Sequence, residues 1–174
     1  MTLTGSLASK LLRESIKDYN YWGQSESDSP LAIKRTKSVM DDKRILSLDA
    51  SVRRKAEQLS GLTETYKAPE RTIRTHTLDE IFKPLVANAL LELESKANVV
   101  KAGKAGIETL QFAAEQTEYY VQLYSVFNQL AEPKVCYVED NVDPSQNDPY
   151  TGLFIIGGSS DGETVYAQGL LIQT

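Results

Sequence analysis

The sequence contains a single cysteine, Cys136, and a single histidine, His76. One cysteine cannot form an internal disulfide, and the two residues together are too few for a structural zinc site. A cysteine–histidine catalytic pair would have to consist of these two, yet Cys136 lies in a predicted strand, where a small thiol is usually inert packing. We therefore expect no catalytic residues, no metal and no cofactor, and a protein that is not an enzyme.

Long apolar runs are also absent. The longest, at 153–156 and 169–172, fall far below the roughly 18 residues that a membrane-spanning helix needs. The first residues become charged before an apolar core of signal-peptide length develops, and no glycine-rich phosphate-binding motif occurs. We expect a cytoplasmic protein, or one assembled in a virion, with no signal peptide, no transmembrane segment and no membrane partner.

Charge is unevenly distributed along the chain. The net charge is −5, but residues 34–55, the basic segment, carry +5 and residues 56–174 carry −9. Such asymmetry suits an anionic partner, or a second copy whose basic segment docks onto an acidic face. The candidate interaction residues of the basic segment are Lys34, Arg35, Lys37, Lys43, Arg44, Arg53, Arg54 and Lys55.

The centre of the chain has the pattern of two helices. Thr77 and Glu80 have the spacing of a capping box, and an apolar stripe follows through Leu93. The stripe resumes at Ile107 after two glycines and continues to Leu130. We predict a central antiparallel helical hairpin over about 78–131.

The last forty residues change to a β pattern. Branched and aromatic residues at 135–138, 153–156 and 164–172 predict three strands of a small antiparallel sheet, and Asp161-Gly162 predicts a hairpin tip. A strand at the chain terminus would leave an edge for a neighbouring subunit. Leu170 and Ile172 of that strand are therefore further candidate interaction residues.

The N-terminal third has weaker patterns. Three helices are predicted here: one over about 7–21, one that begins at Pro30 with Ser29 as its N-cap, and one over about 50–60. Residues 62–76 are interpreted as extended. Tyr21 and Trp22 are aromatic residues of the type enriched at interfaces. The predicted fold is α+β and predominantly helical. One folded domain would comprise an N-terminal helical and extended docking arm, 1–76, and a body, 77–174.

One loop concentrates carboxylates. Residues 139–148 contain four of them together with amide oxygens, which are ligands that calcium accepts. The spacing differs from that of the known helix–loop–helix calcium loop, and Pro144 favours a stiff, solvated connection. We interpret the loop as surface rather than as a metal site.

These observations predict a non-enzymatic structural or assembly subunit of a larger protein complex. A connector, neck or tail component of a virus or phage particle is one concrete version. Its partners would be other protein subunits, in a homo-oligomer or a larger assembly. The alternative is a nucleic-acid-binding accessory protein that uses the basic segment, although no helix-turn-helix or zinc finger accompanies the charge.

Overall fold

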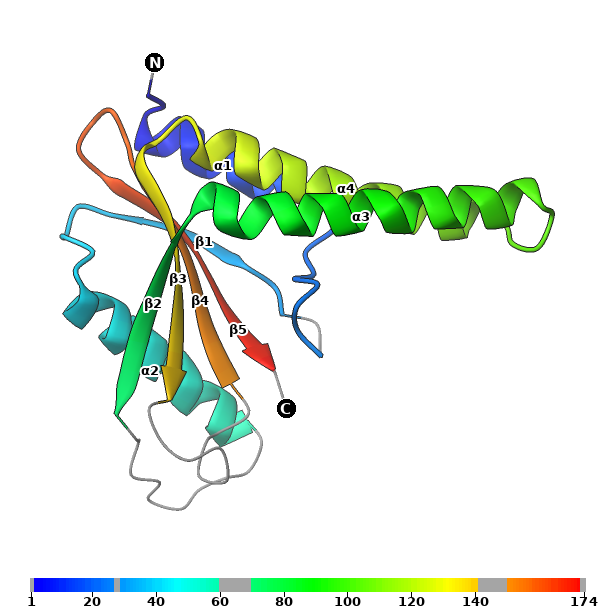
Figure 1. Ribbon diagram of the computed structural model, residues 1–174. Coiled ribbons are helices and arrows are strands. Elements are labelled where there is room, and N and C mark those ends of the chain that lie inside the picture. The colour runs from blue at the N-terminus through cyan, green and yellow to red at the C-terminus, as the bar shows by residue number, and fades with distance from the viewer. Residues whose placement is uncertain (1, 27–28, 60–69, 141–149, 173–174) are drawn as a thin grey trace.

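The computed structural model describes residues 2–26, 29–59, 70–140 and 150–172, and it shows helices packed on an antiparallel sheet (Figure 1). This confirms the α+β class. No helix in these ranges combines the length and the apolar character needed to span a membrane. In chain order the elements are α1 (Gly5–Ser15), β1 (Ala32–Thr36), α2 (Asp42–Leu59), β2 (Arg71–Thr77), α3 (Leu78–Lys101), α4 (Ile107–Phe127), β3 (Ala131–Asp140), β4 (Tyr150–Gly158) and β5 (Thr164–Ile172).

The sheet has five strands in the order β1-β5-β4-β3-β2, and every neighbouring pair is antiparallel. The three predicted C-terminal strands are present as β3, β4 and β5. The turn between β4 and β5 has Gly162 at φ +82°, as the Asp-Gly pair predicted. The sheet is larger than expected because two segments that precede the helical hairpin, β1 and β2, each add one edge strand.

Two predictions about these edges were wrong. The segment after Pro30 is strand β1 rather than a helix, because it pairs with β5, where Ile33 lies opposite Ala167 and is buried in the core on one face of the sheet. Consequently β5 is not an edge strand: β1 pairs with one side of it and β4 with the other. The segment 71–77 is extended, as predicted, and forms the opposite edge; residues 60–69 lie outside the described residues.

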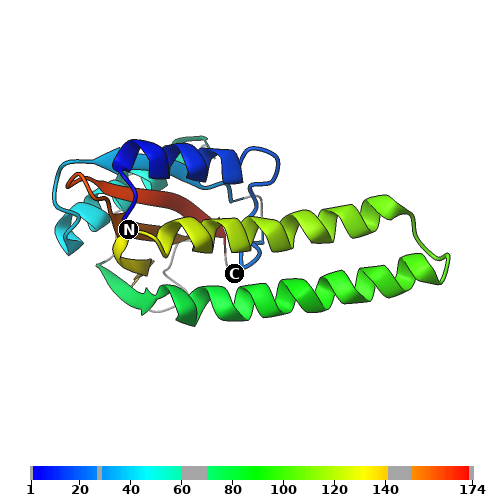
Figure 2. The same cartoon turned by 90° about the horizontal axis from the view of Figure 1, so that it is seen from above.

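The predicted helical hairpin is confirmed as α3 and α4, inserted between β2 and β3. Glu80 N–H donates to Thr77 Oγ1, and Thr77 N–H donates back to the Glu80 carboxylate, so the capping box forms. Gly103, at φ +72°, allows the turn between the helices. Seen from above, the hairpin extends well past the sheet (Figure 2).

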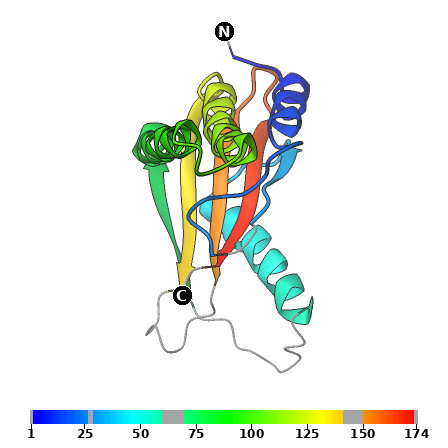
Figure 3. The same cartoon turned by 90° about the vertical axis from the view of Figure 1, so that its right-hand side faces the viewer.

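Helices cover both faces of the sheet. One face packs against α1, α3 and α4 through the larger core, which includes Trp22, Phe82 and Leu123. The other face packs against α2 through a smaller core that includes Ile45 and Phe154. Figure 3 views α3 and α4 nearly end-on, with α1 beside α4.

The separate N-terminal arm therefore needs correction. Residues 2–26 supply α1 and Trp22 to the larger core, and 29–59 supply β1 and α2. These segments are integral to the body because the C-terminal sheet cannot bury both of its faces without them.

Candidate interaction surfaces

The basic segment is divided between the surface and the interior. Seven of its eight cations are exposed on β1, on α2 or between them: Lys34, Arg35, Lys37, Lys43, Arg44, Arg54 and Lys55. Arg53 is the exception and is fully buried under the sheet. Seven of the eight candidate cations are thus on the surface, and Arg53 is not.

Arg53 belongs to a buried ionic network. Its Nε lies 2.8 Å from Asp49 Oδ2, and its Nη1 lies 3.3 Å from Asp140 Oδ1. Arg53 Nη2 donates to the carbonyl oxygen of Val138 at 2.7 Å, and Arg71 Nε lies 3.0 Å from the same Asp140 oxygen. The network connects α2 to β2 and β3, so Arg53 stabilises the fold instead of meeting a partner.

Sequence spacing contained a signal for this network. Asp49 and Arg53 follow Ile45 at intervals of four, which places all three on the sheet-facing side of α2. The Asp49 carboxylate also lies directly against Gly152, where any Cβ would overlap it. Glycine at 152 is therefore required by this close approach of α2 to β4.

The network also contains the start of the predicted acidic loop. Glu139 pairs with Arg74 at 3.0 Å, and Asp140 is held by Arg53 and Arg71. Residues 141–149 lie outside the described ranges. Elsewhere in the described chain, no three His, Cys, Asp or Glu side chains gather closely enough to hold a metal ion.

Of the two aromatic candidate residues, one is buried and the other is exposed. Trp22 is buried, with its ring edge-on to Phe82 and Tyr120, and Nε1 donates to Gln24 Oε1 at 3.1 Å. Tyr21 is exposed and lies edge-on to Tyr19, 5.1 Å between ring centroids. Only Tyr21 remains available to a partner.

Leu170 and Ile172 are half-buried on β5. The backbone at Ile172 is engaged within the chain, since its N–H donates to Ser25 Oγ and its oxygen accepts from Glu26 N–H, each at 2.9 Å. The expected free edge at the end of the last strand is therefore occupied by residues 25–26.

His76 and Cys136 lie on opposite faces of the sheet. In the β2–β3 register His76 pairs with Val135, and Cys136 pairs with Thr75. Successive strand residues point to opposite faces, so the ring and the thiol face different cores. Burial raises the pKa of Cys136, and His76 Nδ1 is 3.0 Å from Glu80 Oε2. The two residues cannot act as a catalytic pair.

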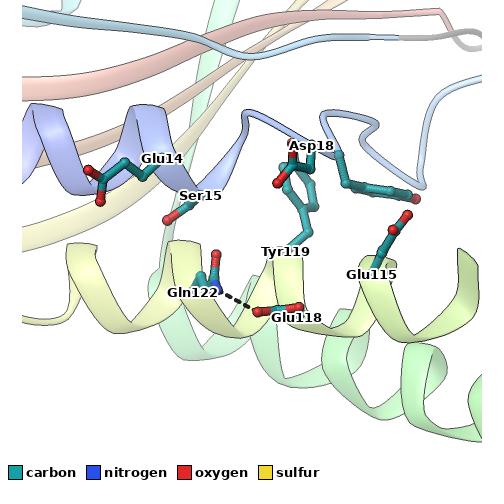
Figure 4. Close-up of a pocket in the computed structure, with 8 residues that line it drawn as sticks. Glu14, Ser15, Asp18, Glu115, Glu118, Tyr119 and Gln122 are labelled. Carbon is teal, nitrogen blue, oxygen red and sulfur yellow. Dashed lines mark hydrogen bonds between the residues drawn. The ribbon is translucent and has the colours of Figure 1, made fainter. Parts of the chain in front are cut away.

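An acidic groove that the sequence did not reveal runs between α1 and α4 (Figure 4). Its four carboxylates come from both sides: Glu14, Asp18, Glu115 and Glu118. Tyr19 and Tyr119 line the same groove, and burial, with the nearby Tyr120, Tyr21 and Glu115, raises the pKa of Tyr19 to about 12. Because α4 carries no lysine or arginine, its carboxylates are not offset on their own helix.

A basic hollow lies on the other flank of α1. Lys10, Arg13 and Lys17 line it from α1 and the turn after it, and Arg35 lines it from β1. Glu14 lines both the basic hollow and the acidic groove. The outer face of α1 thus separates surfaces of opposite charge.

The distal half of the helical hairpin exposes large apolar side chains. Buried residues end at Ala89 on α3 and begin at Ala113 on α4, so nothing between 90 and 112 is buried. Leu91 and Ile107 are 65% and 72% exposed. The large apolar residues of this distal hairpin are Leu90, Leu91, Leu93, Val99, Val100, Ile107, Leu110 and Phe112.

No protein-family model matches this chain, and no curated protein sequence matches it significantly.

Proposed function

We propose that this chain is a non-enzymatic assembly subunit that docks onto other protein subunits through the distal hairpin, residues 90–112. The observation that carries the proposal is that Leu90, Leu91, Ile107 and Phe112 are exposed on a pair of helices of which no residue between 90 and 112 is buried. Single exposed apolar residues are ordinary, but several large ones on one projecting element are typical of a protein interface.

The geometry of the hairpin supports this reading. With 24 residues at 1.5 Å each, α3 is about 36 Å long, and its last buried residue is Ala89, halfway along. Two antiparallel helices bury only the sides that face each other, and helices gain most of their stability from packing. A partner that covers the distal hairpin would supply the missing layer.

A connector, neck or tail component of a virus or phage particle is the concrete form of this proposal that we favour. Subunits of such particles contact several neighbours at once. A small sheet domain with a projecting hairpin has the reach to contact a subunit that its body does not touch (Figure 1).

The test replaces Leu91 and Ile107 together by glutamine. The tagged chain, recovered from its native source, is expected to come with stoichiometric partner subunits in native mass spectrometry, and the double variant is expected to lose at least nine-tenths of them. Its thermal stability should change little, because exposed substitutions usually stay within about 0.5 kcal/mol.

Val39→Gln is the matched control, since Val39 is 79% exposed but lies between β1 and α2. This variant should keep all the partners. Recovery of the wild-type chain without partner subunits would contradict the proposal, as would equal recovery with the Leu91 and Ile107 variant.

A second candidate function is nucleic-acid binding by the basic segment. The observation in its favour is that seven of the eight cations stay exposed, and that Arg35 continues into the basic hollow beside Lys10, Arg13 and Lys17. Clustered cations release counterions from phosphates and so bind nucleic acid in a salt-dependent way.

Lys34→Glu with Lys37→Glu tests this alternative. On a random-sequence DNA duplex, the variant is expected to bind at least tenfold more weakly at low salt. The slope of log affinity against log salt should fall by about 0.9 for each phosphate contact that is lost. Lys101→Glu with Lys104→Glu, near the hairpin tip, is the charge-matched control. Equal affinity of both variants would rule out the basic segment as the binding site.

A further inference from the structure

We propose that the outer face of α1 is the contact of a two-fold dimer, and that its occupant is the same face of a second copy. The inference rests on the proposed function in treating the chain as one of several subunits. It adds a second surface, which is centred on α1 and meets the distal hairpin at Phe112, and names the partner.

The charges on this face form two adjacent stripes. The basic stripe consists of Lys10, Arg13 and Lys17, with Arg35 of β1 beside it. The acidic stripe consists of Glu14 and Asp18 with two carboxylates of α4, Glu115 and Glu118, and Figure 4 shows these side chains around the groove between the helices. Segregation into stripes is unusual for a solvated helix, where the two signs normally alternate.

These charges have few partners within the chain. Among residues 2–26, 29–59, 70–140 and 150–172, no ion pair within 4.0 Å involves the three cations of α1 and its following turn, or any of the four carboxylates. Glu115 and Glu118 accept hydrogen bonds only from the neutral amides of Gln111 and Gln122 among these residues. Arg35 has a contact with Glu163 at 3.6 Å. The charges are therefore available to a partner.

A two-fold axis satisfies both stripes at once. Glu14 lines the acidic groove and the basic hollow, so the two stripes share a boundary on α1. A two-fold axis through that boundary places the basic stripe of each copy on the acidic stripe of the other. Such an isologous contact makes every pairing twice and closes at two subunits.

Apolar side chains lie beside the stripes. Leu7 is 44% exposed and Leu11 is half-buried on the same side of α1, about two turns and one turn before Glu14 respectively. Tyr21 and Phe112 are exposed near the other end of the groove, and both rings contact Tyr19. The face thus combines apolar contact area with complementary charge, as an interface does.

Charge reversal of each stripe, alone and in mixture, tests the dimer. The full-length chain is expected to sediment as a dimer at low salt and to dissociate as salt rises, because screening weakens the exposed pairs. Arg13→Glu with Lys17→Glu cancels the charge of the basic stripe, because only Lys10 and Arg35 remain positive, and Glu14→Lys with Asp18→Lys cancels that of the acidic stripe, where Glu115 and Glu118 remain. Each variant alone should show a dissociation constant raised at least tenfold.

The mixture of the two variants gives the decisive result. In the mixture, the unchanged acidic stripe of one variant faces the unchanged basic stripe of the other, so an equimolar mixture should form a one-to-one dimer tighter than either variant alone. Lys43→Glu with Arg44→Glu, in the first turn of α2, is the charge-matched control and should leave the wild-type dimer unchanged. Failure of the mixture to associate would overturn the inference, as would an equal effect of the control.

These outcomes are separate from those that test the proposed function. A wild-type chain that stays monomeric at all concentrations and salts would overturn the α1 dimer, whereas partner recovery would still depend on Leu91 and Ile107. If the hairpin substitutions abolished the dimer and the α1 reversals left it intact, self-association would take place through the distal hairpin. That result would also overturn the α1 dimer.

Discussion

Arg53→Met is expected to lower the free energy of unfolding by about 3–5 kcal/mol, the usual cost of removing one partner from a buried ion pair. The guanidinium lies between Asp49 and Asp140 and donates to the Val138 oxygen, all away from solvent. Methionine fills much of the volume but leaves the Asp49 carboxylate without the cation 2.8 Å from it. Chemical denaturation monitored by circular dichroism measures the loss.

The adjacent cation supplies the control. Arg54→Met changes the same charge on the same helix, but Arg54 is exposed, so its effect should stay within about 0.5 kcal/mol. Adding Asp49→Asn to Arg53→Met should restore part of the stability, because the neutral amide no longer needs the missing cation. Contacting ionic residues typically couple by 0.5–3 kcal/mol. Equal losses for Arg53→Met and Arg54→Met would contradict the buried network.

Trp22→Ala is expected to destabilise the protein by about 3–5 kcal/mol, the range for truncating a large buried aromatic residue. Trp22 closes the larger core where the segment after α1 meets Phe82 of α3 and Tyr120 of α4. Its neighbour Gly23 donates its N–H to Tyr120 Oη at 2.7 Å, which ties the backbone to the same place. Thermal unfolding followed by far-ultraviolet circular dichroism, which reports backbone structure, measures the loss of stability.

Tyr21→Ala tests whether position or residue type causes that loss. Tyr21 is exposed and its ring contacts only Tyr19 among the described aromatic rings, so the cost should be at most about 1.5 kcal/mol. If Trp22→Ala cost no more than Tyr21→Ala, the segment before β1 would be a dispensable arm, and the larger core would be built without it.

Local patterns predicted the features that depend on neighbours in sequence. The capping box at Thr77, the individual helices α3 and α4 and the Gly162 turn each rest on contacts within a few residues, and each is present. The two edge strands were harder to predict. Ala32–Thr36 is five residues long with only Ile33 buried, and no such short, charged segment shows a clear period.

The candidate sites also differ in whether they depend on local sequence or on contacts between distant segments. Exposure of most of the basic segment followed from composition, since charged residues are rarely buried. Neither the acidic groove nor the basic hollow was visible in the sequence, because Glu115 and Glu118 are about a hundred residues away from Glu14 and Asp18, and Arg35 lies far along the chain from Lys10. Their juxtaposition depends on α1 packing against α4 and β1.

By itself the sequence determined the class of fold, the central hairpin, the C-terminal strands and the excess of cations in residues 34–55, because periodicity, capping and charge are local properties. Only the tertiary structure decided that Arg53 and Trp22 are interior, that β5 is flanked on both sides and that no residue of the hairpin between 90 and 112 is buried. The physical reason is that burial depends on which distant segment arrives to exclude water, and no residue carries that information alone.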